Sequence, residues 1–435
     1  MTSLREQVCD VAVVGGGPAG IAAAVRAAEA PGARRVTLLD EGFRPGGQIW
    51  RSGAGMPPGR MARGWTQRLA AAGVDVRAGH AVVDVRRDAG RFTVLAEHSG
   101  AAVRTHTERL VIATGARERY LPFPGWTLPN VMGIGGAQAL LKAGASFRGK
   151  RVVIAGSGPL LLPVAASLAE ADARIVLVAE QAPRANILRF AASLWRSPAR
   201  LAQAATLRAG FFYAPYATGI WAVSAEGGDV LRSVVVTDGM TTRRIACDVL
   251  CVGFGLVPNT EVAQLLGCAV EQGFVAVDER QSTTVSGVFC AGEPTGIGGV
   301  ERSLVEGEIA GLAAAGAIVR APLVARRASL RRYAAALERA FVLRPELRSL
   351  ARGDTVVCRC EDVRLRELDA TWTARQAKLY TRAGMGACQG RICGAALQCL
   401  MGWTSDTVRP PIQPARLSTM LHGATTSNPT SLGAD

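Results

Sequence analysis

The chain has 435 residues, of which 49% are hydrophobic and 20% charged, so we expect an ordered globular protein of two or three domains. Fifty Lys and Arg residues against 35 Asp and Glu give a net charge of +15, almost all of it arginine. No basic stretch is interleaved with aromatic residues, so we do not expect nucleic-acid binding. We interpret the charge as an Arg-rich surface that attracts anionic cofactors and an acidic protein partner.

The sequence predicts no targeting or membrane segment. Residues 1–10 are polar and lead directly into a strand, which leaves no room for a signal peptide. The apolar run at residues 309–319 is about half the length of a membrane span, so we predict a buried helix there. We therefore expect a cytoplasmic protein with reduced thiols, in which clustered cysteines indicate metal or redox chemistry.

Residues 8–41 have the pattern of a nucleotide-binding unit. A strand at residues 8–14 is followed by Gly15-Gly16-Gly17-Pro18-Ala19-Gly20, an Ala-rich helix at residues 21–30 and a strand at residues 35–41. Gly15 permits the tight turn, Gly17 lets a pyrophosphate approach the backbone, and Gly20 lets helix and strand pack closely. Free N–H groups at the helix N-terminus favour phosphates. Asp40 is placed to accept hydrogen bonds from a ribose, so this unit predicts a dinucleotide site.

A second unit follows residue 150 and matches the pattern only in part. A strand at residues 151–155 precedes Gly156-Ser157-Gly158-Pro159-Leu160-Leu161, a helix, and a strand at residues 173–180 that ends in Glu180. Leu161 takes the third glycine position, and Pro163 strains the opening of the helix. Two interpretations stay open: a working nucleotide site on Gly156, Gly158 and Glu180, or a retained fold with an altered or lost site.

The C-terminal region contains two close pairs of cysteines. Cys358 and Cys360 form a C-x-C arm, and Cys388 and Cys393 form a C-x4-C arm. Four thiolates in two pairs suit a [2Fe–2S] cluster, and the glycines around Cys388 leave backbone N–H groups for the sulfurs. Structural zinc is the main alternative, although a C-x-C arm is not typical of it, and redox-inert thiols are the third. We expect the other six cysteines to pack in cores.

At the level of motifs, the chain resembles the two-dinucleotide-binding-domain flavoprotein superfamily. The resemblance rests on residues 15–20, Gly46-Gly47-Gln48, Ala113-Thr114-Gly115 and Ala291-Gly292-Glu293. It implies an α/β fold with two Rossmann-like domains, the second inserted in the first, where the first holds FAD and the second holds NAD(P). The last motif normally ends in Asp, which holds the ribityl chain, and Glu293 is one methylene longer. The implied FAD residues are Gly15, Gly17, Pro18, Ala19, Gly20, Asp40, Glu41, Gly47, Gln48, Val82, Ala113, Thr114, Gly115, Gly292 and Glu293.

The cysteine region narrows this resemblance. It is similar to the bacterioferritin-associated-ferredoxin-like [2Fe–2S] domain, and its 27-residue gap is most like the version in α subunits of heteromeric amino-acid dehydrogenases. That group includes opine oxidases, hydrogen cyanide synthase, dye-linked proline dehydrogenase and D-hydroxyproline dehydrogenase. In such complexes a β subunit of amino-acid-oxidase type oxidises a C–N bond on its own flavin. The α subunit collects the electrons, in some complexes with FMN at the subunit interface and in some with a small γ subunit.

The resemblance also divides the chain. It implies a discontinuous FAD-binding domain (residues 1–125 and 245–325), an NAD(P)-binding-like domain (126–244), a helical connector (326–350) and a small C-terminal [2Fe–2S] domain (351–404). The Pro-, Ser- and Thr-rich residues 405–435 predict an extended tail.

Three functional hypotheses follow. None of the four histidines stands in an acid–base constellation and no nucleophile pattern is present, so we predict no catalytic residue and assign the chemistry to cofactors. The first hypothesis is an electron-transfer α subunit of an FAD-dependent amino-acid dehydrogenase of D-hydroxyproline, proline or opine type, delivering electrons through flavin and cluster to an acceptor. The second is a self-contained NAD(P)H-dependent reductase, which needs a working second unit. The third is a non-catalytic scaffold without flavin or iron.

Overall fold

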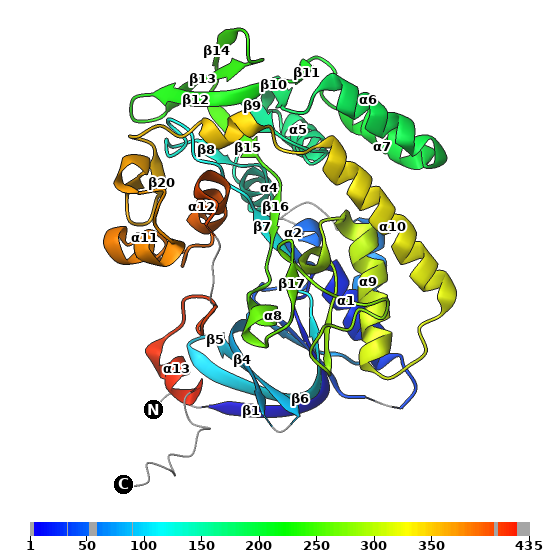
Figure 1. Ribbon diagram of the computed structural model, residues 1–435. Helices are drawn as coiled ribbons and strands as arrows, with labels where there is room; N and C mark the ends of the chain where they lie inside the picture. The colour runs from blue at the N-terminus through cyan, green and yellow to red at the C-terminus, as the bar shows by residue number, and fades with distance from the viewer. Residues whose placement is uncertain (1–3, 33, 52–58, 89, 404–407, 424–435) are drawn as a thin grey trace, which may run out of the picture.

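The chain folds into two Rossmann-like α/β units with a smaller C-terminal unit beside them (Figure 1), which confirms the predicted α/β class. The structure is a computed structural model that describes residues 4–32, 34–51, 59–88, 90–403 and 408–423. The first sheet takes its last strand, β19, from beyond the second sheet in the sequence. One unit is therefore inserted in the other.

The first unit is built on a seven-stranded sheet in the order β3-β2-β1-β6-β5-β4, with β19 beside β6. Residues 11–14 of β1 pair in parallel with β2, and both stretches are buried on both faces, as is typical of a sheet covered by helices. Helix α9 lies against α1, because Gly307 brings its backbone close to the carbonyl of Ala19. Its elements are β1 (Arg5–Val14), α1 (Pro18–Ala28), β2 (Val36–Asp40), α2 (Gly47–Trp50), α3 (Arg60–Ala71), β3 (Asp75–Ala78), β4 (Ala81–Asp88), β5 (Arg91–His98), β6 (Ala101–Ile112), α8 (Glu261–Leu265), β17 (Val270–Glu271), β18 (Phe274–Val275), β19 (Val288–Cys290) and α9 (Gly299–Ala314).

The second unit is built on a parallel five-stranded sheet in the order β11-β10-β9-β15-β8, extended by the antiparallel sheet β12-β13-β14. An antiparallel ribbon of β7 (Ala116–Glu118) and β16 (Leu256–Pro258) joins the two units. We call this ribbon the hinge. The elements of the second unit are β8 (Val131–Gly133), α4 (Ile134–Lys142), β9 (Arg151–Gly156), α5 (Leu161–Glu170), β10 (Arg174–Glu180), α6 (Arg184–Ser193), η1 (Leu194–Arg196), α7 (Pro198–Ala209), β11 (Tyr216–Thr218), β12 (Trp221–Gly227), β13 (Leu231–Thr237), β14 (Thr242–Ala246) and β15 (Val249–Gly253).

The C-terminal part of the chain returns across both units. Helix α10 (Ala321–Ala340) contacts α9 of the first unit and α6 of the second, and η3 (Pro345–Ser349) follows it. The buried side chain of Leu347 packs with the core of the second unit. The small unit, which we call the cysteine unit, contains β20 (Val356–Cys358), β21 (Val363–Arg364), η4 (Leu365–Glu367), α11 (Ala374–Thr381) and α12 (Cys393–Met401).

The tail differs in part from the predicted extended segment. Ile412 donates its amide to the carbonyl of Val83 at 2.9 Å, so this part of the tail lies along β4 of the first unit. A short helix, α13 (Leu417–Gly423), then packs near β5 and β6, where the Thr419 hydroxyl donates to Glu97 at 2.8 Å. Residues 405–407 and 424–435 of the predicted tail lie outside the described residues.

The predicted buried helix at residues 309–319 is confirmed only up to Ala314, where α9 ends; residues 315–319 follow it as a turn and irregular chain. No helix in the described part of the chain is long and apolar enough to cross a membrane.

Candidate functional site

The first glycine loop lies between β1 and α1, where a nucleotide pyrophosphate is expected. Gly15 has φ +107°, and a Cβ atom at Gly20 would lie 1.7 Å from the carbonyl oxygen of Gly15, so only glycine fits there. Helix α1 begins at Pro18, so the amides of its first turn, which includes Ala19, have no partners within the helix. Gly17 precedes that turn in extended conformation. The loop therefore offers free N–H groups at a helix N-terminus.

The second predicted motif packs directly on this loop. The Gly46 amide donates to the carbonyl of Gly16 at 2.7 Å, and a Cβ atom at Gly47 (φ +56°) would lie 3.0 Å from the Cα of Gly17. Gln48 follows in α2 and is exposed. The structure thus brings two predicted motifs, 30 residues apart in sequence, to one place.

Asp40 ends β2 beside the loop. It is buried, its Oδ1 accepts the Gly42 amide at 3.1 Å, and desolvation raises the pKa of its carboxyl group. Glu41, the next residue, is exposed. Asp40 is therefore the better placed of the two carboxylates to face a ribose.

The turn after β6 contains Ala113, Thr114 and Gly115. The carbonyl of Ala113 lies against Gly15, and the Thr114 hydroxyl donates to the carbonyl of Asn259 at 2.6 Å. The Asn259 amide in turn donates to the carbonyl of Gly115 at 3.0 Å. This predicted motif therefore ties the first glycine loop to the returning chain next to the hinge.

Val82 is placed differently from the loop residues. It is buried in β4, and its carbonyl accepts the side-chain amide of Gln413 at 2.9 Å. That acceptor is taken by the tail, and sequence reasoning did not foresee this contact across 331 residues.

Glu293 begins the short 3-10 helix η2 (Glu293–Thr295), and its side chain reaches the N-terminus of α9. Its Oε1 accepts the Gly299 amide at 3.0 Å, whereas its Oε2 is buried and has no hydrogen-bond partner among the described residues. Burial raises the pKa of this carboxyl group. Gly292 (φ +82°) sets the preceding turn. A buried oxygen without a partner fits a cofactor hydroxyl, so the longer side chain does not conflict with the flavin that the resemblance implies.

The second glycine loop is closed by its own acid. The Gly158 amide donates to Glu180 Oε2, and the Ala182 amide donates to Glu180 Oε1, both at 2.8 Å. Glu180 is fully buried, and desolvation raises its pKa to about 7. Helix α5 begins at Leu161, five residues after Gly156, whereas α1 begins three residues after Gly15. The N-terminus of α5 therefore lies farther along the chain from its first glycine than the N-terminus of α1 does.

The chain segment after α10, residues 341–344, crosses this second loop. We call it the strap. The Ser157 hydroxyl donates to the carbonyl of Phe341 at 2.9 Å, and Gln181 Nε2 donates to the carbonyl of Val342 at 3.0 Å. The Arg344 amide donates to Gln181 Oε1 at 3.0 Å, and its guanidinium lies 4.2 Å from the ring centre of Trp221. The side chains of Ser157 in the loop and of Gln181 after β10 thus both donate to backbone carbonyls of the strap.

The four predicted cysteines line one cavity of about 200 Å³. Hydrogen bonds pair Cys358 with Cys393 and Cys360 with Cys388. The Gly384 amide lies 3.4 Å from Cys358 Sγ, and the hydrogen bond with Cys393 lowers the pKa of Cys358 to about 6. Four thiols with N–H donors around one space are the donor set that a [2Fe–2S] cluster uses.

In this arrangement, however, no group of three or more His, Cys, Asp or Glu side chains in the described part of the chain is set up to hold a metal ion. The cavity is closed on its other side by Tyr120, Trp126 and Val131 of the second unit. Trp126 Nε1 donates to the carbonyl of Val356 at 2.7 Å, so the cysteine unit rests directly on the second unit.

Arg117 joins three parts of the molecule. From the hinge, its Nη1 donates to Asn259 Oδ1 at 2.6 Å and to Glu261 Oε1 at 2.8 Å, and its Nε donates to the carbonyl of Arg391 at 3.1 Å. Arg391 lies between Cys388 and Cys393 and donates to the carbonyl of Ile412 at 2.8 Å. The loop of the second cysteine pair is therefore held between hinge and tail.

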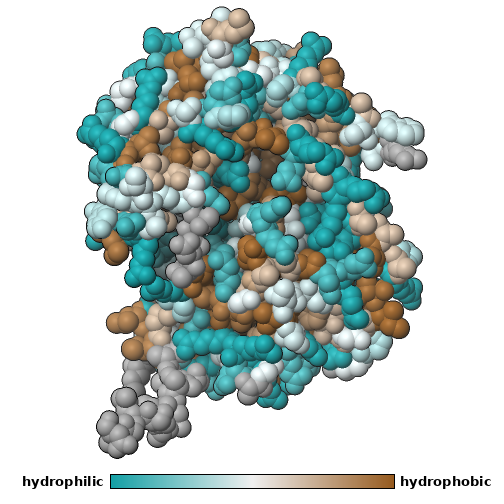
Figure 2. All heavy atoms as spheres, viewed as in Figure 1, coloured by the Kyte–Doolittle hydropathy of each residue, from teal (hydrophilic) through white to brown (hydrophobic). Residues whose placement is uncertain are grey.

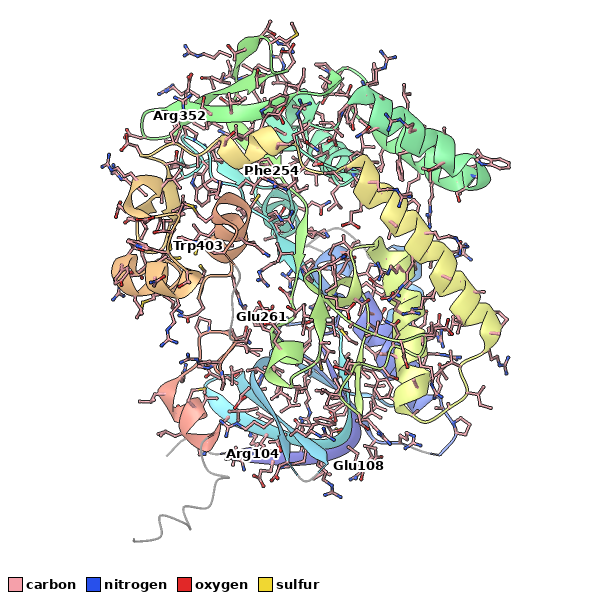
Figure 3. The ribbon with its side chains drawn as sticks, viewed as in Figure 1. Arg104, Glu108, Phe254, Glu261, Arg352 and Trp403 are labelled. Atoms are coloured by element: carbon pink, nitrogen blue, oxygen red, sulfur yellow. The ribbon has the colours of Figure 1, made fainter. Side chains whose placement is uncertain are left out.

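A cleft of about 2740 Å³ separates the first unit from the strap and the cysteine unit. Figure 2 shows that this face of the molecule is hollowed between its upper and lower parts. Phe254, Glu261 and Trp403 lie on the walls of the cleft (Figure 3). Glu293 also lines it. The cleft thus connects the loop that carries Glu293 with the cysteine unit.

Sequence reasoning missed the residues that make these junctions. Ser157 stood inside a recognised loop, but its partner Phe341 lies 184 residues away. Arg117 follows Ala113-Thr114-Gly115 without any motif of its own. Only their position next to recognised motifs could have drawn attention to them.

Comparison with known proteins decides the family. Residues 9–310 match the pyridine nucleotide-disulphide oxidoreductase family. The A subunit of opine oxidase from Agrobacterium tumefaciens is 31% identical over 95% of this chain and 91% of its own length. The HcnB subunit of hydrogen cyanide synthase from Pseudomonas aeruginosa is 33% identical, covering 91% of this chain and 92% of its own. The chain belongs to the pyridine nucleotide-disulphide oxidoreductase family.

Within this family the chain is an oxidoreductase similar to the A subunits of opine oxidases and to HcnB, which confirms the predicted resemblance to these subunits, while the predicted [2Fe–2S] domain stays a prediction. The crystal structure of L-proline dehydrogenase from P. horikoshii has a TM-score of 0.69 and covers 97% of this chain and 81% of that chain. At 19% identity this is a likeness of fold. T. acidophilum thioredoxin reductase, with a TM-score of 0.56 and 23% identity, covers 71% of this chain and 98% of that chain.

Proposed function

We propose that the chain is the electron-transfer α subunit of a heteromeric dehydrogenase that oxidises a C–N bond of an amino acid or opine on a partner β subunit. The observation that carries the proposal is the presence, in one chain, of a complete first glycine loop and a cavity lined by Cys358, Cys360, Cys388 and Cys393. The relatives add support, because the opine oxidase and hydrogen cyanide synthase chains are by name subunits of larger enzymes.

FAD is the cofactor that we assign to the first loop. The amides at the start of α1 would hold the pyrophosphate, Asp40 would accept hydrogen bonds from the ribose, and Glu293 Oε2 would accept one from the ribityl chain. When bound, FAD supplies a carrier that takes up two electrons and releases them singly. The chain's own residues fix its position and keep its phosphates at the positive end of a helix.

A [2Fe–2S] cluster is the group that we assign to the four cysteines. The Gly384 amide stabilises negative charge on Cys358, and Gly386 lets the two cysteine arms meet, since a Cβ atom there would lie 2.2 Å from that of Cys360. When bound, the cluster supplies a one-electron carrier. Tyr120 and Trp126 cover its cavity and exclude water from that side.

The closed second loop favours this proposal over a self-contained NAD(P)H-dependent reductase. In that alternative, Gly158 has to donate its amide to a phosphate, whereas here it donates to Glu180. Electrons then have to arrive from a partner subunit, not from a nicotinamide nucleotide.

The test is to purify the chain alone and together with its co-expressed partner, and to measure flavin, iron and amine-dependent dye reduction. We expect flavin and iron in the chain alone, with amine oxidation only in the complex. Full-rate oxidation by the chain alone would contradict the proposal. Rapid bleaching of the flavin by NADH would favour the reductase, and absence of both flavin and iron would favour a scaffold.

A further inference from the structure

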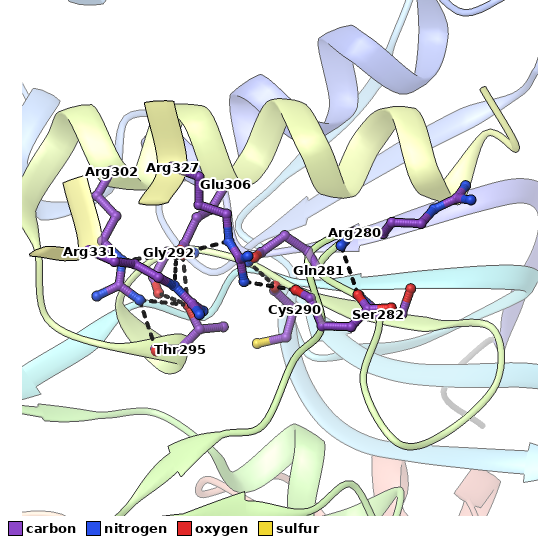
Figure 4. Close-up of polar contacts among 11 residues, drawn as sticks. Arg280, Gln281, Ser282, Cys290, Gly292, Thr295, Arg302, Glu306, Arg327 and Arg331 are labelled. Atoms are coloured by element: carbon purple, nitrogen blue, oxygen red, sulfur yellow. Dashed lines mark hydrogen bonds and ion pairs between the residues drawn. The ribbon is translucent and has the colours of Figure 1, made fainter. Parts of the chain in front are cut away.

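A buried charged network lies directly behind the loop that carries Glu293 (Figure 4). At its centre is Glu306, which is fully buried on α9. Its Oε2 accepts the Gly292 amide at 3.1 Å and the Thr295 hydroxyl at 2.6 Å, one on each side of Glu293. Glu306 therefore fixes the turn that presents Glu293 to the cleft.

Three arginines surround this single carboxylate. The Nε atoms of Arg302, Arg331 and Arg327 lie 2.8, 3.4 and 3.9 Å from Glu306 Oε1. The other bonds of these side chains go to backbone or hydroxyl oxygens: Arg302 Nη2 donates to the carbonyl of Thr295, and Arg327 Nη2 to that of Asp278. Three positive charges thus face one negative charge, and the side chains of Arg302 and Arg327 are only 6% exposed.

The charges of Arg302 and Arg327 are weakly screened because they lie away from water, whereas Arg331, which is 36% exposed, is screened more strongly. Desolvation lowers the pKa of Arg327 to about 10, so the guanidinium still carries its charge at neutral pH. Glu293 adds at most one further negative charge to the buried network. Asp278, the other carboxylate that interacts with Arg327, is exposed, and its Oδ1 accepts the amides of Arg280 and Ser282, so it offsets the remaining positive charge only weakly.

This surplus lies beside the site that we assign to FAD. Arg302 and Arg331 line the same stretch of cleft wall as Glu293 and residues 296–299, where α9 begins. The positive end of α9 points to the same place, so helix and arginines act in the same direction. An anion in this part of the cleft is stabilised by both.

We propose that the network of Arg302, Glu306, Arg327 and Arg331 raises the reduction potential of the bound flavin. Two-electron reduction of a flavin with uptake of one proton leaves a negative charge on its ring system, and the electrons come from the amine oxidised on the partner subunit. A nearby surplus of positive charge stabilises that product over the neutral oxidised ring. This inference rests on the proposed function, because it requires FAD at the first loop.

The test compares the flavin midpoint potential of purified variants by dye equilibration, with FAD retained per chain as the second measurement. Arg327→Met removes one positive charge, and we expect a lower potential, by about tenfold in the ratio of oxidised to reduced flavin, or 29.6 mV for two electrons. Arg327→Lys keeps the charge and should restore most of the wild-type value. Arg326→Met, at the exposed neighbouring position, is the matched control and should change nothing.

Glu306→Gln distinguishes an effect of charge on the flavin potential from an effect of disturbed structure. It removes the one negative charge, so the potential should rise, opposite to Arg327→Met, although both changes disturb the same network. If Arg327→Met does not fold, Arg331→Met tests the same direction at a side chain that is 36% exposed. Variants that retain FAD with an unchanged potential, or that shift it in the same direction for both charges, overturn the inference. A wild-type chain without flavin overturns the proposed function itself.

Discussion

The amide of Gly158 donates to Glu180 at 2.8 Å, so the second glycine loop binds a carboxylate of its own chain where a nucleotide loop binds phosphate. Both oxygens of Glu180 are used, the second by the Ala182 amide. The strap then covers Ser157 and Gln181. The second loop is therefore tied both to Glu180 and to the strap, while Ser157, Gly158 and Leu160 still line the cleft.

We expect the second unit to bind no nicotinamide nucleotide. The Gly158 amide and the side chains of Ser157 and Gln181 already have partners, and opening the strap requires breaking the bonds of Ser157, Gln181 and Arg344. Calorimetric titration of the flavin-loaded chain with NADH and with NADPH should show no site tighter than about 1 mM. Micromolar binding would mean that the strap opens in solution.

Glu180 should make the fold less stable as the pH rises. Desolvation raises its pKa from 4.5 to about 7, so the folded chain holds a proton that the unfolded chain has lost between these values. The unfolding free energy should therefore fall by up to about 3 kcal/mol from pH 4.5 to pH 7. Melting temperatures between pH 5 and pH 8 should show this slope in the wild type and not in Glu180→Gln. Glu170→Gln, at an exposed position of α5, should keep the slope.

Gly20→Ala should destroy the first unit. The new Cβ atom would lie 1.7 Å from the carbonyl oxygen of Gly15, and neither α1 nor β1 can move away without breaking the core. We expect the free energy of unfolding to fall by at least about 4 kcal/mol, and we expect the variant to retain no flavin. Gly64→Ala is the control, because Gly64 lies in α3 with open space around it. Gly64→Ala should raise the free energy of unfolding by about 0.5–1 kcal/mol. Thermal unfolding and flavin release measure both.

The sequence predicted those parts of the molecule whose chemistry is local. The first loop is set by residues 15–20 and by Asp40, so its strand, turn, helix and acid could be recognised from spacing alone. Leu161 marked the second loop as different in sequence, and the helix there begins only at Leu161 itself. Its closure by residues 341–344 could not be predicted, because no local pattern says which distant backbone covers a loop. The same holds for Glu306, whose partners Arg327 and Arg331 come from another helix.

Cys358→Ser and Cys388→Ser should each abolish cluster binding. Each removes one of four thiols from the same cavity, and a serine oxygen is a poor ligand for iron in such a site. Iron should fall from about two atoms per chain to near zero, together with the visible absorption of the cluster. Cys399→Ser is the control, because Cys399 lies on α12 outside that cavity and should leave the iron content unchanged. Zinc in the wild type in place of iron would contradict the cluster and support a structural metal site.

Arg117→Gln should loosen the cysteine unit. The guanidinium is 25% exposed and joins Asn259 and Glu261 of the first unit to the carbonyl of Arg391, between Cys388 and Cys393. Glutamine is too short to reach these partners and carries no charge, so we expect the free energy of unfolding to fall by about 2 kcal/mol. Hydrogen exchange should become faster in residues 386–393, with little change in β1 or β9.

Arg91→Gln is the control, because its ion pair with Glu108 is long, at 3.8 Å, and exposed, so its loss should cost less than about 1 kcal/mol. Unchanged exchange at residues 386–393 in Arg117→Gln would mean that the tail, through Ile412, holds this loop without the hinge.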